Sequence, residues 1–448
     1  MKKVTIRINE IDPILKIPRP CWLPKDWYKE NENPLDYFDE LDRPFFEDKD
    51  ALGRFTLDSW IGPSSYNDHE FEITETPTSN YFYVISTLPF DFWDKRIEYD
   101  FIPKEVLKDI SNGKCKIVFY MDDDGHWFST LPYFYNSKHS IKKMNGFIKK
   151  YNFKKEDIIF LSHNIALEDN SEKYNFTALS CSPFSKRKAA PDRNKMPFYV
   201  NYSHCEYVEN EDYSYDVEKL DKVFLAYNNR VKSYRIYLIY QLLKNNLLDK
   251  QLWSFCGLGG TIYFEETEER LNEYFSDNNI EKFDKKLFTK VENLLGKEIL
   301  SDDIRVDEFP GEYYGQYLQI KDFEKTFFSL VTESEVADDS IYFSEKMIKP
   351  LIAKHPFILI SSKGTIKKLK ELGFKTFDKW WDESYDECDY FIQRIDKIVK
   401  IVQEISNKPK EQLVKMREEM KDICNHNQKL LFSFNTNPLG QLLSEIKF

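Results

Sequence analysis

The sequence predicts an α/β protein with two domains, each built on a parallel sheet, that face one another across a cleft. Three observations predict this fold class. The chain has 448 residues, which is too long for one ordinary hydrophobic core. Short apolar runs typical of buried strands alternate with helical stretches in two separate regions. Between these regions, residues 182–218 combine prolines, a basic run and an acidic, tyrosine-rich stretch, which is the composition of a connector.

The first region is predicted as an α/β domain with its connector over residues 76–215. Residues 1–75 are rich in proline, acidic and aromatic residues without a clear periodicity, so we expect an irregular extension packed on this domain. Within the domain, a helical stretch with one apolar face separates two apolar runs, and that order predicts a parallel sheet. The expected strands are 81–86, 116–121 and 157–162, and the expected helix is 140–151.

The second region is predicted as another α/β domain over residues 216–405, followed by a C-terminal helix segment over 406–448. Its clearest part is 327–377, where the pattern predicts strand, loop, helix, strand, helix and a last strand. The other expected elements are strands at 223–226 and 252–255 and helices at 232–245, 281–296 and 410–431.

Composition and charge limit the function. Hydrophobic residues at 41% and charged residues at 31% indicate a folded globular chain. The net charge of −12 disfavours a nucleic-acid partner, although a local basic patch can act within an acidic protein. Seven cysteines without CxxC spacing indicate reduced thiols and a cytoplasmic location. We expect no signal peptide and no membrane span, because no stretch approaches the roughly 18 apolar residues that a span needs.

The candidate ligand-binding residues lie within 327–377. The predicted strand ends at Glu333-Ser334, and after an acidic loop Ser344 precedes Glu345 and Lys346 at the start of a helix. Ser344 is a suitable N-cap, and the free N–H groups of a helix N-terminus favour an anion such as a diphosphate. Lys346 would add positive charge, and Glu345 would accept hydrogen bonds from two ribose hydroxyls. The alternative is an ordinary βαβ unit with solvated surface charges.

A proline and two glycines delimit the helices of this stretch. Pro350 lies deeper in the first helix than proline prefers, so we expect a kink or an early end there. Gly364 and Gly373 bracket the next helix, and Gly373 stands at the position where a left-handed residue often ends a helix.

The segment 327–377 resembles the donor-binding region of GT-B glycosyltransferases of the α1,3-fucosyltransferase type and, more loosely, of exostosin-like enzymes. The GT-B fold consists of two Rossmann-like domains that face a cleft. The resemblance implies that Glu345 binds the ribose and Lys346 the phosphate of a nucleotide sugar, and that Glu333-Ser334 is the turn after the strand. Lys349 and Pro350 match less diagnostic positions.

Residues 224–235 resemble the strand-to-helix turn that opens the donor domain in phage and bacterial relatives of this group. The resemblance implies that Asn229, Arg230 and Arg235 belong to the donor site. Both arginines would offer forked donors to the diphosphate of the leaving nucleotide. Alternatively, either arginine is an exposed charge at the start of a helix.

Two departures from the family pattern limit what carries over. The fucosyltransferase turn usually has Asn after its Glu, where this chain has Ser334, and the loop 335–342 is strongly acidic. Fucose is therefore unsupported as the donor sugar. We expect a UDP- or GDP-sugar as co-substrate, with no permanently bound cofactor and no metal.

The candidates for the base that accepts the acceptor's proton follow the expected strand 116–121. They are Asp122, Asp123, Asp124 and His126, and we expect three adjacent carboxylates to repel one another and so to raise the pKa of at least one, which suits a base. The alternative is a solvated acidic turn. Asp122 and Asp124 also match the Asp-x-Asp signature of metal-dependent GT-A transferases, in which carboxylates hold the diphosphate through manganese.

The sequence therefore predicts a metal-independent, base-assisted glycosyltransferase that moves a sugar to a hydroxyl group of a glycan or a small molecule. One alternative is a phage-type enzyme that acts on hydroxymethylated DNA bases. Another is a GT-B-like protein that binds a nucleotide or glycan without catalysis. The chain has no GxxxxGK[ST] sequence, which disfavours ATP-driven phosphoryl transfer.

Overall fold

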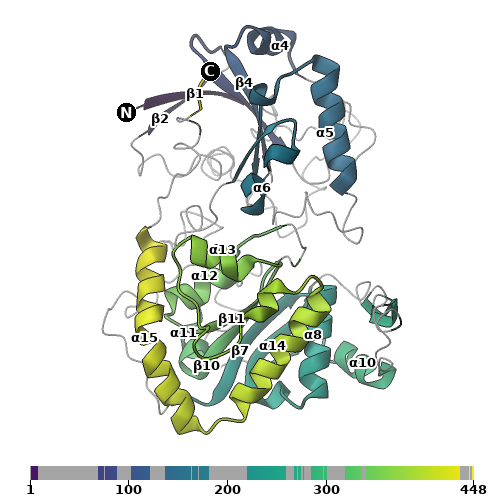
Figure 1. Cartoon of the computed structure of the whole chain (residues 1–448), viewed down its shortest axis with the longest axis vertical. Coiled ribbons are helices and arrows are strands. Elements are labelled where there is room, and N and C mark those ends of the chain that lie inside the picture. Colours follow the sequence, from purple (N-terminus) through teal and green to yellow (C-terminus); the bar gives the residue numbers. More distant parts are fainter. Residues whose placement is uncertain are drawn as a thin grey trace, which may run out of the picture. The chain divides into compact units, whose positions relative to one another are not determined.

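The computed structural model of the chain divides into two compact units (Figure 1). The first comprises Met1–Lys188, Asp339–Tyr342 and Phe434–Phe448, and the second comprises Ala189–Asp338 and Phe343–Ser433. The structure describes residues 2–8, 69–74, 76–87, 102–121, 137–162, 164–169, 171–180, 219–258, 267–269, 271–273, 276, 284–295, 297–299, 318–334, 336, 340–433, 443 and 446–448.

The first unit is built on a sheet whose described strands are all parallel. The strand order is β2-β1-β3-β4-β5-β6, so the order reverses direction between β1 and β3. The strands are β1 (Lys2–Ile8), β2 (His69–Ile73), β3 (Tyr81–Thr87), β4 (Cys115–Met121), β5 (Ile158–Ser162) and β6 (Thr177–Ser180).

Alternate residues of this sheet pack into two separate cores, because successive side chains of a strand point to opposite faces. On one face, Phe119 and Phe160 pack with the apolar sides of α4 (Lys104–Ser111) and α5 (Ser137–Tyr151). On the other face, residues such as Val118 and Ile159 pack with Leu443. The ring of Phe448 also lies 4.9 Å from that of Phe82. The C-terminal residues therefore complete the second core of the first unit. The remaining short helices are α6 (Ala166–Asp169), η5 (Lys155–Asp157) and η6 (Ser171–Lys173).

The second unit is built on a sheet with the order β11-β10-β7-β8-β9. Its first four strands are parallel, and β9 runs antiparallel to β8. The chain passes from β7 to β8 on one side and returns to β10 on the other, so the order reverses between β7 and β10. The strands are β7 (Lys222–Arg230), β8 (Gln251–Leu258), β9 (Lys297–Ile299), β10 (Thr326–Thr332) and β11 (Phe357–Ile360).

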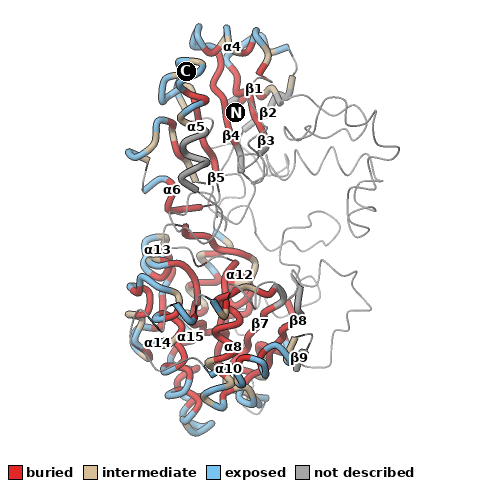
Figure 2. Tube along the Cα trace, turned by 90° about the vertical axis from the view of Figure 1, so that its right-hand side faces the viewer, coloured by how far each residue is buried: buried red, intermediate tan, exposed pale blue. Residues whose placement is uncertain are grey.

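Helices cover both faces of the second sheet. Figure 1 shows α8 and α14 on one side and α12 and α15 on the other, and α8 packs on α14 and α10 while α12 packs on α15 and β10. Figure 2 shows the buried positions concentrated on the strands and on α8 and α12. The helices are α8 (Ser233–Lys244), η8 (Leu248–Lys250), α10 (Lys285–Glu292), α11 (Ile320–Glu324), α12 (Glu345–Ile352), α13 (Thr365–Glu371), η11 (Ser384–Glu387), α14 (Phe391–Ser406) and α15 (Lys410–Ser433).

Both units are thus α/β with Rossmann-like parallel sheets, as expected, and the helix ends also follow the prediction. Gly373 has a φ of 92° directly after α13. Pro350 lies in the last turn of α12, which ends two residues later, with Lys354 in the left-handed region and the N–H of His355 bonded to the Pro350 carbonyl. This is the Schellman pattern, which satisfies the last carbonyls of the helix.

Several parts of the fold differ from expectation. Residues 2–8 and 69–73 are strands rather than an irregular extension, because Val4 and Ile6 alternate with polar residues and enter the core. The helix α14 was missed by sequence reasoning. α15 belongs to the second unit, whereas the residues after it belong to the first.

The strand expected near residues 374–377 is instead a loop whose backbone is bonded by side chains. Asn427 bonds both the N–H and the carbonyl of Lys375, each at 2.8 Å, and Glu383 accepts from the N–H of Phe377 at 2.9 Å. These partners replace the neighbouring strand that a sheet would need.

Candidate functional site

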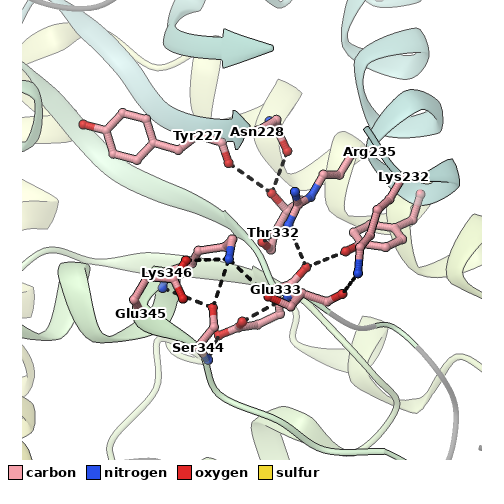
Figure 3. Close-up of polar contacts among 11 residues, drawn as sticks. Tyr227, Asn228, Lys232, Arg235, Thr332, Glu333, Ser344, Glu345 and Lys346 are labelled. Atoms are coloured by element: carbon pink, nitrogen blue, oxygen red, sulfur yellow. Dashed lines mark hydrogen bonds and ion pairs between the residues drawn. The ribbon is translucent and has the colours of Figure 1, made fainter. Parts of the chain in front are cut away.

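The polar residues identified in the sequence meet at the C-terminal ends of β7 and β10, where the second sheet reverses its strand order. In open α/β sheets the ligand site lies at such a point, because the connecting chain leaves the two strands in opposite directions and opens a crevice. Figure 3 shows the residues that meet there: Tyr227, Asn228, Lys232, Arg235, Thr332, Glu333, Ser344, Glu345 and Lys346.

Glu333 connects the end of β10 to the start of α12. Its Oε1 accepts from the N–H of Ser344 at 3.0 Å, and its Oε2 accepts from the N–H of Ser334 at 3.2 Å. The side chain has no exposed surface. Burial raises the pKa of Glu333, while the nearby Lys346 and the Ser344 N–H oppose that rise. Glu333 therefore shapes the turn and does not present its carboxylate to a ligand.

The N-terminus of α12 is already occupied by acceptors from the protein. Ser344 is the N-cap, as predicted, and its Oγ accepts from the N–H of Lys346 at 3.2 Å. The carboxylate of Glu333 takes the N–H of Ser344, and a negative charge is favourable at that end of a helix. An anion at this position would therefore depend on the Lys346 side chain more than on free N–H groups of the helix.

Glu345 and Lys346 lie together and are partly open to solvent. The Lys346 Nζ is 2.6 Å from Glu345 Oε1, and it also donates to Ser334 Oγ at 3.1 Å. Their side chains are 22% and 23% exposed, so a ligand can reach both. The structure thus brings together the two residues that the sequence assigned to the ribose and the phosphate.

Arg235 is placed differently from the expectation. Its side chain is 1% exposed, and its guanidinium donates to the carbonyls of Thr332 at 3.3 Å and Glu333 at 3.1 Å. The hydroxyl of Tyr234 donates to the same Glu333 carbonyl at 2.7 Å. Arg235 therefore holds the backbone of the turn after β10 and does not face the crevice as a diphosphate ligand.

The start of α8, in contrast to that of α12, carries no compensating acid. Its first turn has no acidic residue, and no side chain caps it. Two buried polar atoms nearby, Ser233 Oγ and Asn228 Nδ2, have no hydrogen-bond partner among the residues that the structure describes. Lys232, just before the helix, donates its Nζ to the Ser334 carbonyl. A helix dipole that no acidic residue of the first turn compensates makes this helix start the stronger anion site of the two.

Thr332 joins the two strands at the reversal. Its Oγ1 donates to Asn228 Oδ1 at 2.7 Å, and Asn228 receives support from β8 because its N–H donates to Ser254 Oγ at 3.2 Å. Sequence reasoning missed Asn228, Lys232 and Thr332 as site residues. The signal that could have identified them is their position at or just after the ends of two expected strands.

Several predicted residues cannot be placed in the site. Asn229 and Arg230 are the last residues of β7, where the register with β8 shifts, but their side chains lie outside the described part. Asp122, Asp124 and His126 follow β4 and lie outside the described residues altogether. Their roles remain predictions.

Lys349 lies one turn beyond Glu345, against a small pocket between α11, α12 and the two strands. Its Nζ is 5.3 Å from the centre of the Tyr227 ring. Burial lowers the pKa of Lys349 to about 8, with Glu345 opposing that shift and Lys346 adding to it. The hydroxyl of Tyr227 donates to Asp322 Oδ2 at 2.6 Å. The structure thus places Lys349 beside the predicted donor residues but deeper in the unit.

No helix in the described part of the chain is both long and apolar enough to cross a membrane. Within the same residues, no three His, Cys, Asp or Glu side chains gather in a way that could hold a metal ion. Comparison with protein-family models and with curated proteins gave no match for this chain.

Proposed function

We propose that this chain is a GT-B-type glycosyltransferase that transfers a sugar from a UDP- or GDP-sugar to a hydroxyl group of a glycan or small molecule. One observation carries the proposal. Glu345, Lys346 and the uncapped start of α8 meet at the strand-order reversal of a Rossmann-like sheet. That is where such sheets bind nucleotides.

In this proposal the nucleotide donor is held by two neighbouring groups. The carboxylate of Glu345 accepts hydrogen bonds from the two ribose hydroxyls. Lys346 exchanges its present partners, Glu345 and Ser334, for a phosphate oxygen. The positive end of the α8 dipole attracts the rest of the diphosphate, and Arg230 follows at the end of β7. Positive groups around the diphosphate stabilise the charge that develops on the leaving nucleotide.

The chemical step needs a base from the first unit. Asp122, Asp124 or His126 would take the proton of the acceptor hydroxyl, whose oxygen then attacks the anomeric carbon of the sugar. The bond between that carbon and the phosphate oxygen breaks, and the nucleoside diphosphate leaves with the bonding electrons. Glu333 and Arg235 act as positioning residues, because they hold the turn that presents Ser334 to Lys346.

Calorimetry with UDP and GDP tests the donor site. We expect Lys346→Met to weaken binding of the preferred nucleotide by at least about tenfold, since a charge-assisted hydrogen bond contributes roughly 1.5–3 kcal/mol. Glu345→Gln should remove the preference for that nucleotide over its 2′-deoxy form. The matched controls are Lys367→Met and Glu371→Gln on α13, an exposed pair 4.0 Å apart. Unchanged affinity in both site variants would refute the donor site.

An activity assay separates this function from the alternatives. Release of the nucleoside diphosphate from a UDP- or GDP-sugar, with and without glycan acceptors, should occur in the presence of a chelator. Loss of activity with the chelator would indicate the metal-dependent alternative. Transfer only to hydroxymethylated DNA would identify the nucleic-acid alternative. Tight nucleotide binding without hydrolysis or transfer would indicate a binding protein.

A further inference from the structure

The pocket beside α12 holds a buried positive charge. Its polar lining comes from four elements: Tyr227 of β7, Gln319 at the start of α11, Ser329 and Thr332 of β10, and Glu345, Lys346 and Lys349 of α12. Its volume is about 40 Å³, and a water molecule needs roughly 10–15 Å³ measured in this way. The pocket therefore has room for a group of three or four heavy atoms, but not for a whole nucleotide.

Lys349 is the unusual member of this lining. It is 7% exposed, and its Nζ makes no hydrogen bond or ion pair with the residues that the structure describes. Its contact is with the face of the Tyr227 ring, 5.3 Å away. Burial of an ammonium group is costly unless the group is paired, and a cation–π contact offsets only part of that cost.

The two acidic groups near Lys349 are engaged elsewhere. Glu345 is bonded to Lys346 at 2.6 Å. Asp322 accepts the hydroxyl of Tyr227 at 2.6 Å, on the far end of the ring that Lys349 covers. Both carboxylates are thus bonded to groups other than Lys349. The pocket has a cation that faces it and lacks an anion bonded to that cation.

We propose that this pocket binds a small oxyanion group, carboxylate or phosphoryl, through the ammonium group of Lys349. Lys346 lines the same pocket and adds a second positive charge. A carboxylate or phosphoryl group fits the volume and supplies the oxygen acceptors that the ammonium lacks. The site does not depend on sugar transfer, since a free oxyanion or a phosphoryl group of a nucleotide would satisfy the same chemistry.

The protonation of Lys349 makes the site dependent on pH. The titratable groups that face it are Glu345 and Lys346 on α12, Asp322 on α11 and Tyr227 on β7. Burial, reinforced by Lys346, lowers the pKa of Lys349 to about 8, although Glu345 and Asp322 oppose the shift. Only the ammonium form attracts an anion, so affinity should fall about tenfold between pH 7 and pH 9. A lysine of ordinary pKa would stay charged over that range.

Binding of sulfate and acetate to the full chain, measured by calorimetry at pH 7 and pH 9, tests the proposal. Both anions stay fully ionised over this range. We expect the wild type to bind at least one of them about tenfold more weakly at pH 9. Lys349→Met and Lys349→Gln should lose that binding at pH 7, whereas Lys346→Met should keep the dependence on pH. Absence of binding, or binding that survives both Lys349 variants, would overturn the proposal.

Titration of UDP and GDP in the same variants identifies the source of the group. If the nucleotide supplies the phosphoryl group, the affinity for the nucleotide should fall at pH 9 and in the Lys349 variants, as the affinity for sulfate does. If the ligand is a separate oxyanion, the affinity for the nucleotide should fall in Lys346→Met and stay unchanged in the Lys349 variants. Acylation by acetic anhydride at pH 8 gives an independent readout: Lys349 should be modified in the free protein and protected by the bound anion. Labelling that the anion leaves unchanged would contradict the site.

Discussion

At the scale of single residues, the geometry of the proposed donor site depends on the buried carboxylate of Glu333, which bonds backbone N–H groups. Glu333 bonds the N–H of Ser344, eleven residues further along the chain, and so fixes where α12 begins. Arg235 and Tyr234 bond the carbonyl of the same residue from the opposite side. The positions of Glu345 and Lys346 therefore follow from buried groups that have fixed partners.

Glu333→Ala should destabilise the second unit by about 2–4 kcal/mol. The substitution leaves the buried N–H groups of Ser334 and Ser344 without acceptors, and each such loss costs roughly 1–3 kcal/mol. Urea denaturation gives the change in the free energy of unfolding. The control is Glu371→Ala, whose side chain is 48% exposed and should shift the same quantity by less than about 0.5 kcal/mol. Equal effects of the two variants would contradict the role given to Glu333.

At the scale of elements, the glycine inside α5 and the glycine after α13 differ in whether their backbone conformation requires glycine. Gly373 ends α13 with a φ of 92°, and a Cβ there would lie 3.4 Å from Leu430 Cδ2. Gly146 is inside α5, and a Cβ there would meet no atom within 4 Å. The first glycine is needed for the backbone conformation that it adopts. The second only adds conformational entropy to the unfolded chain.

Alanine at the two glycines should therefore have opposite effects. We expect Gly373→Ala to lower the free energy of unfolding by about 1–2 kcal/mol, because a side chain is disfavoured at positive φ. Gly146→Ala should raise it by about 0.5–1 kcal/mol, the difference in helix propensity. Thermal unfolding of the two variants beside the wild type measures both effects. The same sign in both would show that the backbone conformation at residue 373 does not control the substitution.

The loop after α12 is tied to β10 through a neutral histidine. The Nε2 of His355 lies 2.9 Å from the Thr326 carbonyl, which can only accept, so Nε2 carries the hydrogen and Nδ1 accepts from Ser329 Oγ at 2.8 Å. Burial, with Arg417 nearby, holds the pKa of His355 well below its usual 6.5.

This histidine should weaken the fold in acid. Below pH 6.5 the unfolded chain binds a proton that the folded chain does not, so stability falls as the pH drops, by up to about 1.4 kcal/mol per pH unit. Urea denaturation of the wild type and of His355→Gln between pH 8 and pH 5 measures the slope. The variant should have the smaller slope. At pH 8 the ring is neutral in both states, so any difference there reflects the lost hydrogen bonds alone. Parallel curves down to pH 5 would contradict the assignment.

At the scale of the whole molecule, the two units are interleaved along the chain. Residues 339–342 belong to the first unit although their flanking segments belong to the second. Ile341 is bonded there: its carbonyl accepts from the N–H of Ile165 at 2.8 Å, and its N–H donates to Asn164 Oδ1 at 2.9 Å. The C-terminal residues return in the same way, because Leu443 is buried against the sheet of the first unit.

Leu443→Ala should destabilise the first unit selectively, by about 2–4 kcal/mol, since it leaves a cavity in one of the two cores of that unit. Hydrogen exchange followed by mass spectrometry should then show faster exchange in β1, β3 and β4, with little change in β7 and β10. The control is Ile395→Ala, a buried residue of α14 that should produce the reverse pattern. Faster exchange of β7 and β10 in Leu443→Ala would contradict the assignment of Leu443 to the first core.

The sequence predicted those parts of the fold whose signal is local. Strands such as β4 and β5 are short apolar runs, and α8 repeats apolar residues at helical spacing, so each could be recognised without its neighbours. The loop at residues 374–377 could not be recognised in this way, because its bonding partner Asn427 lies 52 positions away. Arg235 was predicted as a ligand because an arginine side chain suits a phosphate. Its guanidinium instead bonds the carbonyls of Thr332 and Glu333, which are distant in the sequence.

The return of the C-terminal residues to the first unit also orders events during synthesis. The strands of the first unit leave the ribosome early, but one of the two described cores of their sheet lacks Leu443 and Phe448 until these residues are available. Meanwhile the second unit, which ends at Ser433, can already form its core. An apolar sheet face that waits for the last segment is open to wrong contacts. We expect a nascent chain stopped after α15 to need chaperone protection that a chain extending through Phe448 does not.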